Sequence, residues 1–388
     1  MTIAAVVFGS RPLGVAGVGL LLAAGLTRTW IGFVRGPVSV RYAWTPQPAT
    51  EGERVRLGVV ARRASRMPVG SIVVRGRLGR LGPHECRLRG HRRRASGVVD
   101  LGRLPRGRFV LSDVRLDLGD HLGLHATSTP VEVAGAVVVH PRIVQLHALF
   151  SDAGRFGGDG RRVLLRRAVG FDFHSVREYE QGESLRRVHW PTTAKRGQLM
   201  VKELEDSPRD AVVVLLDCDP AGAAGEPPGS SFDEAVRAAG SLLDAYARRG
   251  REVTLVTTGR ERALVRIRAR DPDRRAALDV LAAAEPDALH SLAHTLGHGQ
   301  PPGLEAGELA VVTGYLDPPT AARLIGAAQQ RLVSVVWIDA PSYVGRPTRA
   351  SPGLLRLASA GIPTAVVRRG DDLASALDLP VGQVAARG

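Results

Sequence analysis

Residues 211–219 read AVVVLLDCD, six apolar residues followed by Asp217, Cys218 and Asp219. A strand buried on both faces of a parallel sheet has this continuous apolar composition, whereas a half-exposed strand alternates apolar and polar residues. The acidic residues that follow the run lie at the carboxyl end of the strand, which is the edge where open α/β sheets bind ligands. The stretch therefore predicts a central strand of an α/β domain, with Asp217 and Asp219 at a candidate site.

The sequence after residue 219 alternates between helix and strand patterns. Residues 231–234 read SFDE, which has the composition of a helix start, because serine caps a helix and acidic residues favour its first turn. Gly250 is placed to end this helix. The alternation predicts a doubly wound, mostly parallel sheet with helices on both faces. We expect the other strands at 252–258, 263–268, 309–315, 333–339 and 363–367, and the other helices at 271–284, 319–331, 352–360 and 373–377.

The sequence before the α/β domain is rich in short extended segments. Residues 114–118 read VRLDL and alternate as a strand with one buried face does. Residues 104–107 read LPRG, a combination typical of a turn. Short strands at this spacing predict a β-sandwich-like domain over residues 37–145. Its expected strands are 38–44, 55–60, 71–78, 98–101, 108–116 and 136–140.

The amino-terminal segment is apolar. Residues 12–26 are uncharged, and extending the stretch to residue 34 adds Arg28 as a charge. Because a membrane-spanning helix needs roughly 20 apolar residues, we expect a membrane anchor within residues 1–36. A cleaved signal peptide and a buried or peripheral helix are the alternatives. Arginines are more frequent after the segment than before it, which predicts a cell-membrane protein with most of its chain on the cytoplasmic side.

Residues 170–206 read GFDFHSVREYEQGESLRRVHWPTTAKRGQLMVKELED. The stretch mixes charged and aromatic residues without the period of an amphipathic helix. It ends five residues before the strand predicted at residue 211, so the connecting chain keeps it close to that sheet. We expect Trp190 to be buried against the sheet, and the arginines around it to pair with nearby carboxylates.

The same stretch contains a family motif, R-E-Y-x-x-G-D-x-x-R-x-I-x-W, followed by a small-basic pair and L-x-V-[RK]-E. It resembles the signature of the domain-of-unknown-function 58 family. Glu183 replaces the aspartate of the motif and Lys195 an arginine, and both keep the charge. The matching residues, which we take as a docking element, are Arg177, Glu178, Tyr179, Gly182, Glu183, Arg187, Trp190, Lys195, Lys202 and Glu203.

The family resemblance implies an architecture and a partner. It implies a membrane anchor, a β-rich region and a von Willebrand factor A-like domain, which we place at residues 209–388 after a linker and signature at 146–208. It also implies cooperation with a MoxR-type AAA+ ATPase in the assembly or maturation of other proteins. We therefore expect a non-enzymatic protein-interaction factor.

The strand end at Asp217 is also a candidate metal site. Metal-binding von Willebrand A domains carry D-x-S-x-S here, whose hydroxyls and carboxylate suit Mg²⁺. This chain has Asp217, Asp219 and Ala221 at those positions. We therefore expect no cofactor, with weak Mg²⁺ binding at most. The alternative is a metal-dependent hydrolase that uses Asp217 and Asp219.

The charge is concentrated in the first part of the chain. The 388 residues have a formal net charge of +15, and residues 1–150 hold 22 arginines and 8 acidic residues. A basic surface suits anionic lipid or nucleic acid, so a binder acting through residues 54–108 is a third hypothesis. No nucleic-acid motif occurs, and we expect no nucleic-acid partner. Cys86 and Cys218 are too far apart in the sequence to indicate a disulfide framework.

Overall fold

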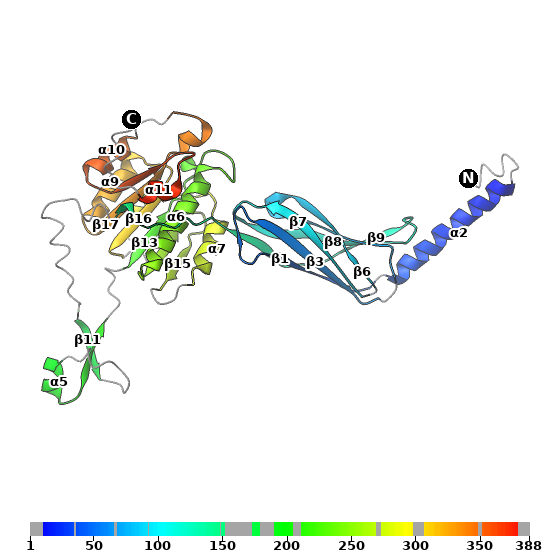
Figure 1. Ribbon diagram of the computed structural model, residues 1–388, viewed down its shortest axis with the longest axis horizontal. Coiled ribbons are helices and arrows are strands. Elements are labelled where there is room, and N and C mark those ends of the chain that lie inside the picture. The colour runs from blue at the N-terminus through cyan, green and yellow to red at the C-terminus, as the bar shows by residue number, and fades with distance from the viewer. Residues whose placement is uncertain are drawn as a thin grey trace. The chain divides into compact units, whose positions relative to one another are not determined.

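The computed structural model describes residues 11–34, 36–65, 68–91, 93–147, 149–151, 173–178, 190–204, 211–268, 273–297, 306–347 and 351–378. The chain divides into two compact units, Met1–His140 and Pro141–Gly388 (Figure 1). The first unit holds an apolar helix and mostly antiparallel sheets, and the second holds a mixed sheet between helices. The predicted combination of an apolar N-terminal helix, a β-rich region and an α/β domain is thus observed as a mixed α/β structure.

The second unit is built on a sheet whose described strands follow the order β15-β14-β13-β16-β17-β18 (Figure 1). Neighbouring strands are parallel except for β15, which is antiparallel to β14 at the edge. The predicted central strand, β13, lies between β14 and β16. The strands are β13 (Val212–Leu216), β14 (Val253–Thr257), β15 (Leu264–Ile267), β16 (Glu308–Thr313), β17 (Leu332–Ile338) and β18 (Thr364–Val367).

Helices cover both faces of this sheet. Val212, Val214 and Leu216 pack on one side with α6, α7 and α11. Val213 and Leu215 pack on the other side with α8, α9 and α10. Two-sided burial explains why the β13 sequence is apolar without alternation. The helices are α6 (Ser231–Arg248), α7 (Arg275–Ala283), α8 (Leu292–Gly297), α9 (Pro318–Ala328), α10 (Pro352–Ser359) and α11 (Leu373–Asp378), with short 3-10 turns η4 (Pro220–Gly222) and η5 (Ala340–Val344).

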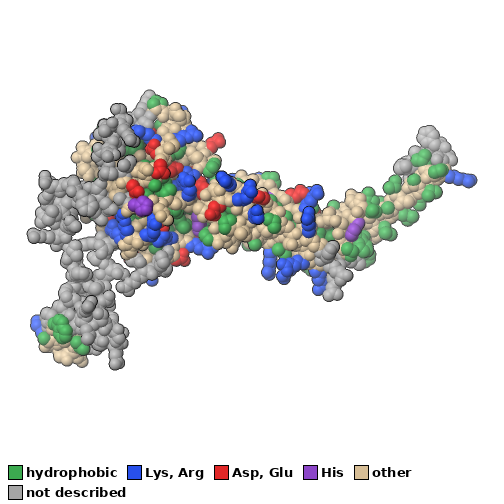
Figure 2. All heavy atoms as spheres, in the orientation of Figure 1, with side chains coloured by type: hydrophobic (Ala, Val, Ile, Leu, Met, Phe, Trp, Pro, Cys, Tyr) green, Lys and Arg blue, Asp and Glu red, His purple; other side chains and the backbone are tan. Residues whose placement is uncertain are grey.

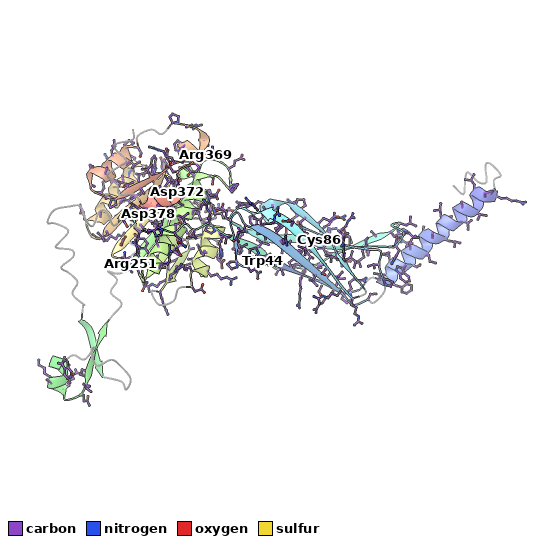
Figure 3. The ribbon with its side chains drawn as sticks, viewed as in Figure 1. Trp44, Cys86, Arg251, Arg369, Asp372 and Asp378 are labelled. Atoms are coloured by element: carbon purple, nitrogen blue, oxygen red, sulfur yellow. The ribbon has the colours of Figure 1, made fainter. Side chains whose placement is uncertain are left out.

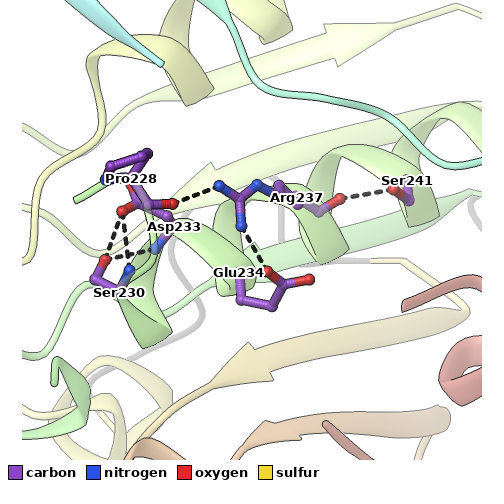
Figure 4. Close-up of polar contacts among 6 residues, drawn as sticks. All are labelled: Pro228, Ser230, Asp233, Glu234, Arg237 and Ser241. Atoms are coloured by element: carbon purple, nitrogen blue, oxygen red, sulfur yellow. Dashed lines mark hydrogen bonds and ion pairs between the residues drawn. The ribbon is translucent and has the colours of Figure 1, made fainter. Parts of the chain in front are cut away.

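Helix α6 begins with a reciprocal cap (Figure 4). The Ser230 hydroxyl accepts a hydrogen bond from the Asp233 amide at 3.1 Å, and the Asp233 carboxylate accepts one from the Ser230 amide at 3.3 Å. The cap therefore lies one residue before the predicted Ser231. The Ser231 hydroxyl instead donates to the Gly222 carbonyl oxygen and so ties the helix to the preceding loop. Sequence alone could not choose between two adjacent serines, because either can cap.

The amino-terminal edge of the sheet is fixed by a buried acidic residue. Glu308, the first residue of β16, accepts a hydrogen bond from the Tyr246 hydroxyl at 2.6 Å and pairs with Arg251 (labelled in Figure 3). Burial and the Glu308 charge raise the pKa of Tyr246 well above its ordinary value, so its hydroxyl remains a donor. These contacts join α6, β16 and the approach to β14.

The α/β unit begins earlier than predicted. The Val144 amide donates to the Ser241 hydroxyl of α6 at 3.1 Å. Leu146, Leu149 and Phe150 are buried in the same core as α6. The predicted linker at 146–208 is therefore wrong at its start, because its first apolar residues pack on the domain.

The described strands of the first unit form two sheets that share one hydrophobic core. Cys86 lies in that core (labelled in Figure 3). Each expected strand is present, and the additional strands β2, β5, β6 and β9 are short segments without a clear apolar alternation. The strands are β1 (Val38–Thr45), β2 (Ala49–Thr50), β3 (Arg54–Arg63), β4 (Ser71–Leu78), β5 (Pro83–Arg87), β6 (Arg89–His91), β7 (Arg94–Arg103), β8 (Gly107–Gly119), β9 (Ala126–Pro130) and β10 (Ala136–His140).

Helix α2 (Arg11–Val34) precedes the first sheet. Among the described residues, α2 is the one helix that is long and apolar enough to cross a membrane. Of its most apolar stretch, 22% is buried. Its last turns contact the β-sandwich: Val34 joins the sandwich core, and the Trp30 indole donates to the Pro68 carbonyl oxygen at 3.1 Å. The rest of the helix exposes large apolar side chains, including Val15, Leu22 and Leu26.

Replacing the cap of α6 should destabilise the α/β unit. We expect Ser230→Ala to lower the free energy of unfolding by about 1–2 kcal/mol, because the Asp233 amide loses its acceptor. Thermal or urea unfolding measures the change. Ser359→Ala removes an exposed serine late in α10 and should change stability by less than about 0.5 kcal/mol. Equal effects of the two substitutions would contradict the assigned cap.

Candidate functional site

The candidate site lies at the carboxyl ends of three adjacent parallel strands. Asp217 follows β13, Thr258 follows β14, and Thr313 is the last residue of β16. Their exposed fractions are 4%, 4% and 0%. Because β13 lies between its two parallel neighbours, the ends of all three strands meet at one edge, where such sheets bind ligands. Residue types suited to a polar site are thus brought together, but inside the domain.

Each oxygen of the Asp217 carboxyl group has a partner. Oδ1 accepts hydrogen bonds from the Thr258 hydroxyl and the Asp219 amide, each at 3.2 Å. Oδ2 lies 2.7 Å from the Thr313 hydroxyl oxygen. Thr258 also accepts a hydrogen bond from the Cys218 amide at 2.8 Å, so its own proton is free to point at Asp217.

The Thr313 hydroxyl constrains the proton on Asp217. Its oxygen lies 2.7 Å from both Asp217 Oδ2 and the carbonyl oxygen of Tyr315. A hydroxyl has one hydrogen and satisfies one of these acceptors. If Asp217 is protonated, its Oδ2 donates to Thr313, which donates to Tyr315, and every short contact becomes a hydrogen bond. The geometry therefore favours a neutral Asp217.

The electrostatic environment acts in the same direction. Burial raises the pKa of Asp217 to about 6, although hydrogen bonds from Thr313 and the Asp219 amide lower it and the Asp219 charge raises it further. Burial likewise raises the pKa of the neighbouring Cys218 thiol, to about 12, so this cysteine is a neutral core residue. The Cys218 thiol therefore does not have the properties of an activated nucleophile at neutral pH.

The predicted metal ligands do not form a centre. Asp219 turns its Oδ1 to the Ala221 amide at 2.9 Å and caps η4. Within the described residues, no group of three or more histidines, cysteines or acidic residues is placed to hold a metal ion. Mg²⁺ takes octahedral oxygen ligands and retains several waters, whereas Asp217 is buried and engaged on both oxygens. The residues present therefore do not fit a Mg²⁺ centre, and no catalytic step is derived from them.

Sequence reasoning selected Asp217 and did not select Thr313. A threonine that closes the apolar run of β16 is the signal that was available. Thr313 can be recognised as a partner of Asp217 when β16 is known to lie beside β13. Which strands are neighbours is decided by the sheet order and not by the local sequence.

The two ends of the signature pair as neighbouring strands. Strands β11 (Phe173–Glu178) and β12 (Met200–Leu204) are antiparallel, with Arg177 opposite Val201 and Glu178 opposite Met200. In the same register Lys202 lies opposite Val176, and Glu203 lies opposite Ser175. The predicted docking residues Tyr179, Gly182, Glu183 and Arg187 lie outside the described residues.

A short helix, α5 (Trp190–Arg196), precedes β12. It ends because Gly197 adopts a left-handed conformation with φ +68°, and the Gly197 amide donates to the Thr193 carbonyl oxygen at 2.9 Å. The Thr193 hydroxyl accepts from the Met200 amide at 3.0 Å and so joins the helix to β12. Met200 is the buried residue of this junction, with 1% of its surface exposed.

The predicted burial of Trp190 is wrong. Its side chain is 65% exposed at the first position of α5. The apolar contact of the helix–strand junction is supplied by Met200 instead. Lys195, Arg196 and Leu199 are also exposed. Proximity along the chain to β13 did not determine whether Trp190 is buried.

Comparison with known proteins agrees with the signature. Residues 175–342 match the family described as "Protein of unknown function DUF58". The family resemblance is confirmed. The DUF58 match runs from β11 to η5 and so includes both the paired signature strands and the Asp217 cluster.

Two further similarities describe the relatives of this chain. Over 221 residues it is 27% identical to "Uncharacterized protein YeaD" of Bacillus subtilis (strain 168), covering 56% of this chain and 53% of that protein. The chain thus spans about half the length of this relative. The solved structure of Cwp6 from Clostridium difficile is 10% identical, with a TM-score of 0.20, over 87% of this chain and 38% of that one. That similarity is too weak to define a shared fold.

The Asp217 cluster should make stability depend on pH. A folded pKa of about 6, raised from 3.8, means that the folded state binds the proton more tightly. The resulting stabilisation is present below pH 3.8 and is lost as the pH rises through about 6. Asp217→Asn keeps the shape and does not titrate. Between pH 4.5 and 7, wild type should lose about 2 kcal/mol of unfolding free energy relative to this variant. A constant difference in urea unfolding would contradict the raised pKa.

Proposed function

We propose that the chain is a membrane-anchored, non-enzymatic interaction factor with most of its residues on the cytoplasmic side of the cell membrane. The apolar helix α2 supports the anchor, and the arginines that follow it support the orientation. The strand-end site gives no support to the alternative of a metal-dependent hydrolase, because both oxygens of Asp217 are engaged and Asp219 caps a turn.

We propose further that the α/β unit is a von Willebrand factor A-like domain. The support is its strand order, a parallel sheet with the antiparallel strand β15 at one edge and helices on both faces. A domain of this kind acts in binding when its loops or added segments carry the contact residues. In this chain the added segment is the signature, which precedes β13.

The observation that carries the docking proposal is the exposed Trp190 on α5. Tryptophan and arginine are the residue types that contribute most often to binding energy at interfaces. The side chain of Leu199, which follows the helix, is 40% exposed. The exposed Lys195 and Arg196 add positive charge at the end of the helix. This surface suits a partner that offers an apolar pocket rimmed by carboxylates. The family resemblance supplies the partner class, a MoxR-type AAA+ ATPase.

The test is the binding of the full-length chain to the MoxR-type ATPase of the source organism. We expect Trp190→Ala to weaken binding by roughly 30-fold or more, the effect of a strong interface residue. Its melting temperature should equal that of wild type, because the side chain is exposed. Leu355→Ala is a matched control, since Leu355 is 67% exposed on α10 of the same unit.

Two results would contradict the proposal. A lower melting temperature of Trp190→Ala would indicate that this side chain stabilises the fold. Unchanged binding by both variants would remove α5 from the interface.

A further inference from the structure

One end of the β-sandwich lies where α2 meets it, and we call it the juxtamembrane end. The Trp30 indole of α2 donates to Pro68. Two residues further on, the Gly70 amide donates to the Gly119 carbonyl oxygen at 2.9 Å. Gly119 ends β8 and begins the loop of residues 120–125 that leads to β9. This loop is therefore at the same end of the sandwich as α2.

The loop of residues 120–125 has a fixed shape and an apolar tip. The buried Asp120 carboxylate accepts hydrogen bonds from the Leu124 amide at 3.1 Å and the His125 amide at 2.7 Å. Gly123 has φ +71°, a conformation that favours glycine. The side chains of Leu122 and Leu124 are 64% and 48% exposed. The Asp120 contacts thus hold a loop whose two leucines, on either side of Gly123, are exposed.

Basic side chains surround the same end. Arg62 in β3 lies opposite Arg94 in β7. The next residue of β3, Arg63, lies opposite Val38, the first residue of the strand that follows α2. Arg93 lies in the adjoining turn, and all three arginines are exposed. Figure 2 shows arginine side chains along the visible face of the sandwich, including the end next to α2.

The opposite end of the sandwich carries charges of both signs, and the register partners Arg54 and Arg103 are exposed there. The exposed carboxylates of Glu53 and Asp113 lie toward the opposite end of the sandwich, near the start of β3 and the first half of β8.

We propose that the juxtamembrane end is a second membrane contact. Leu122 and Leu124 enter the interfacial layer of the bilayer, and Arg62, Arg93 and Arg94 bind anionic lipid headgroups. The inference rests on the proposed function in one respect, that α2 anchors the chain. Juxtamembrane basic residues are attracted to anionic leaflets within a Debye length, and apolar side chains at that depth leave water. Such a contact would fix the orientation of the sandwich on the membrane.

The test uses the full-length chain with single cysteines carrying an environment-sensitive fluorophore. Cys86 and Cys218 are both buried, so an introduced Leu122→Cys or Leu124→Cys is labelled selectively. Val110→Cys is the control, because Val110 is 51% exposed on β8 at the opposite end of the sandwich. The proteins are incorporated into liposomes of neutral phospholipid with or without anionic phospholipid, and a quencher is attached to the lipid chains.

We expect blue-shifted emission and lipid quenching for the labels at 122 and 124, increased by anionic phospholipid, and neither effect at 110. The combined variant Arg62→Glu, Arg93→Glu and Arg94→Glu should lose the dependence on anionic lipid while its far-ultraviolet circular dichroism stays unchanged.

The outcomes separate this inference from the proposed function. Flotation with liposomes while labels at 122 and 124 remain as accessible to water as the label at 110 overturns the inference alone. Failure to float overturns the anchor, and the inference with it. Salt-sensitive binding of duplex DNA that depends on the three arginines, without lipid quenching of the loop labels, also overturns it and assigns the end to nucleic acid.

Discussion

The buried carboxyl group of Asp217 joins the ends of three strands, and the α/β unit depends on this contact. Apolar burial holds β13 between its neighbours. It does not fix the alignment of the strand ends or the conformation of the loops that follow them. Hydrogen bonds from Thr258 and Thr313 do so, because an unpaired buried acid would cost several kcal/mol. With a pKa raised to about 6, Asp217 holds its proton below that pH and is ionised above it.

The sequence predicts the elements better than their contacts. The apolar run at residues 211–216 and the alternation around it lead to the correct class, since period and burial are local properties of a chain. The contacts of Trp190 are not local: its neighbours depend on how the signature folds back on itself, where Met200 fills the junction. The predicted linker includes Leu146, Leu149 and Phe150, although these side chains are buried in the same core as α6. The partner of Asp217 in β16 becomes evident when the sheet order is known.

The inferred functional surfaces belong to the signature helix α5 and to the β-sandwich, not to the strand ends where ligands usually bind. At the strand ends, both oxygens of Asp217 are engaged in contacts within the domain. The exposed residues to which we assign contacts are on the signature helix α5 and on the loop of residues 120–125. One suits a protein partner and the other suits an anionic bilayer, so a chain with this arrangement would hold a protein complex close to the membrane.

The central claim is that the Asp217 cluster is a structural contact and not a metal centre. Titration calorimetry of the full-length chain with Mg²⁺, at neutral pH and in parallel with Asp217→Ala, tests it most directly. The account predicts no specific heat of binding at millimolar Mg²⁺ in either protein. A micromolar affinity that disappears in Asp217→Ala would contradict it and would support metal-dependent chemistry at this strand end.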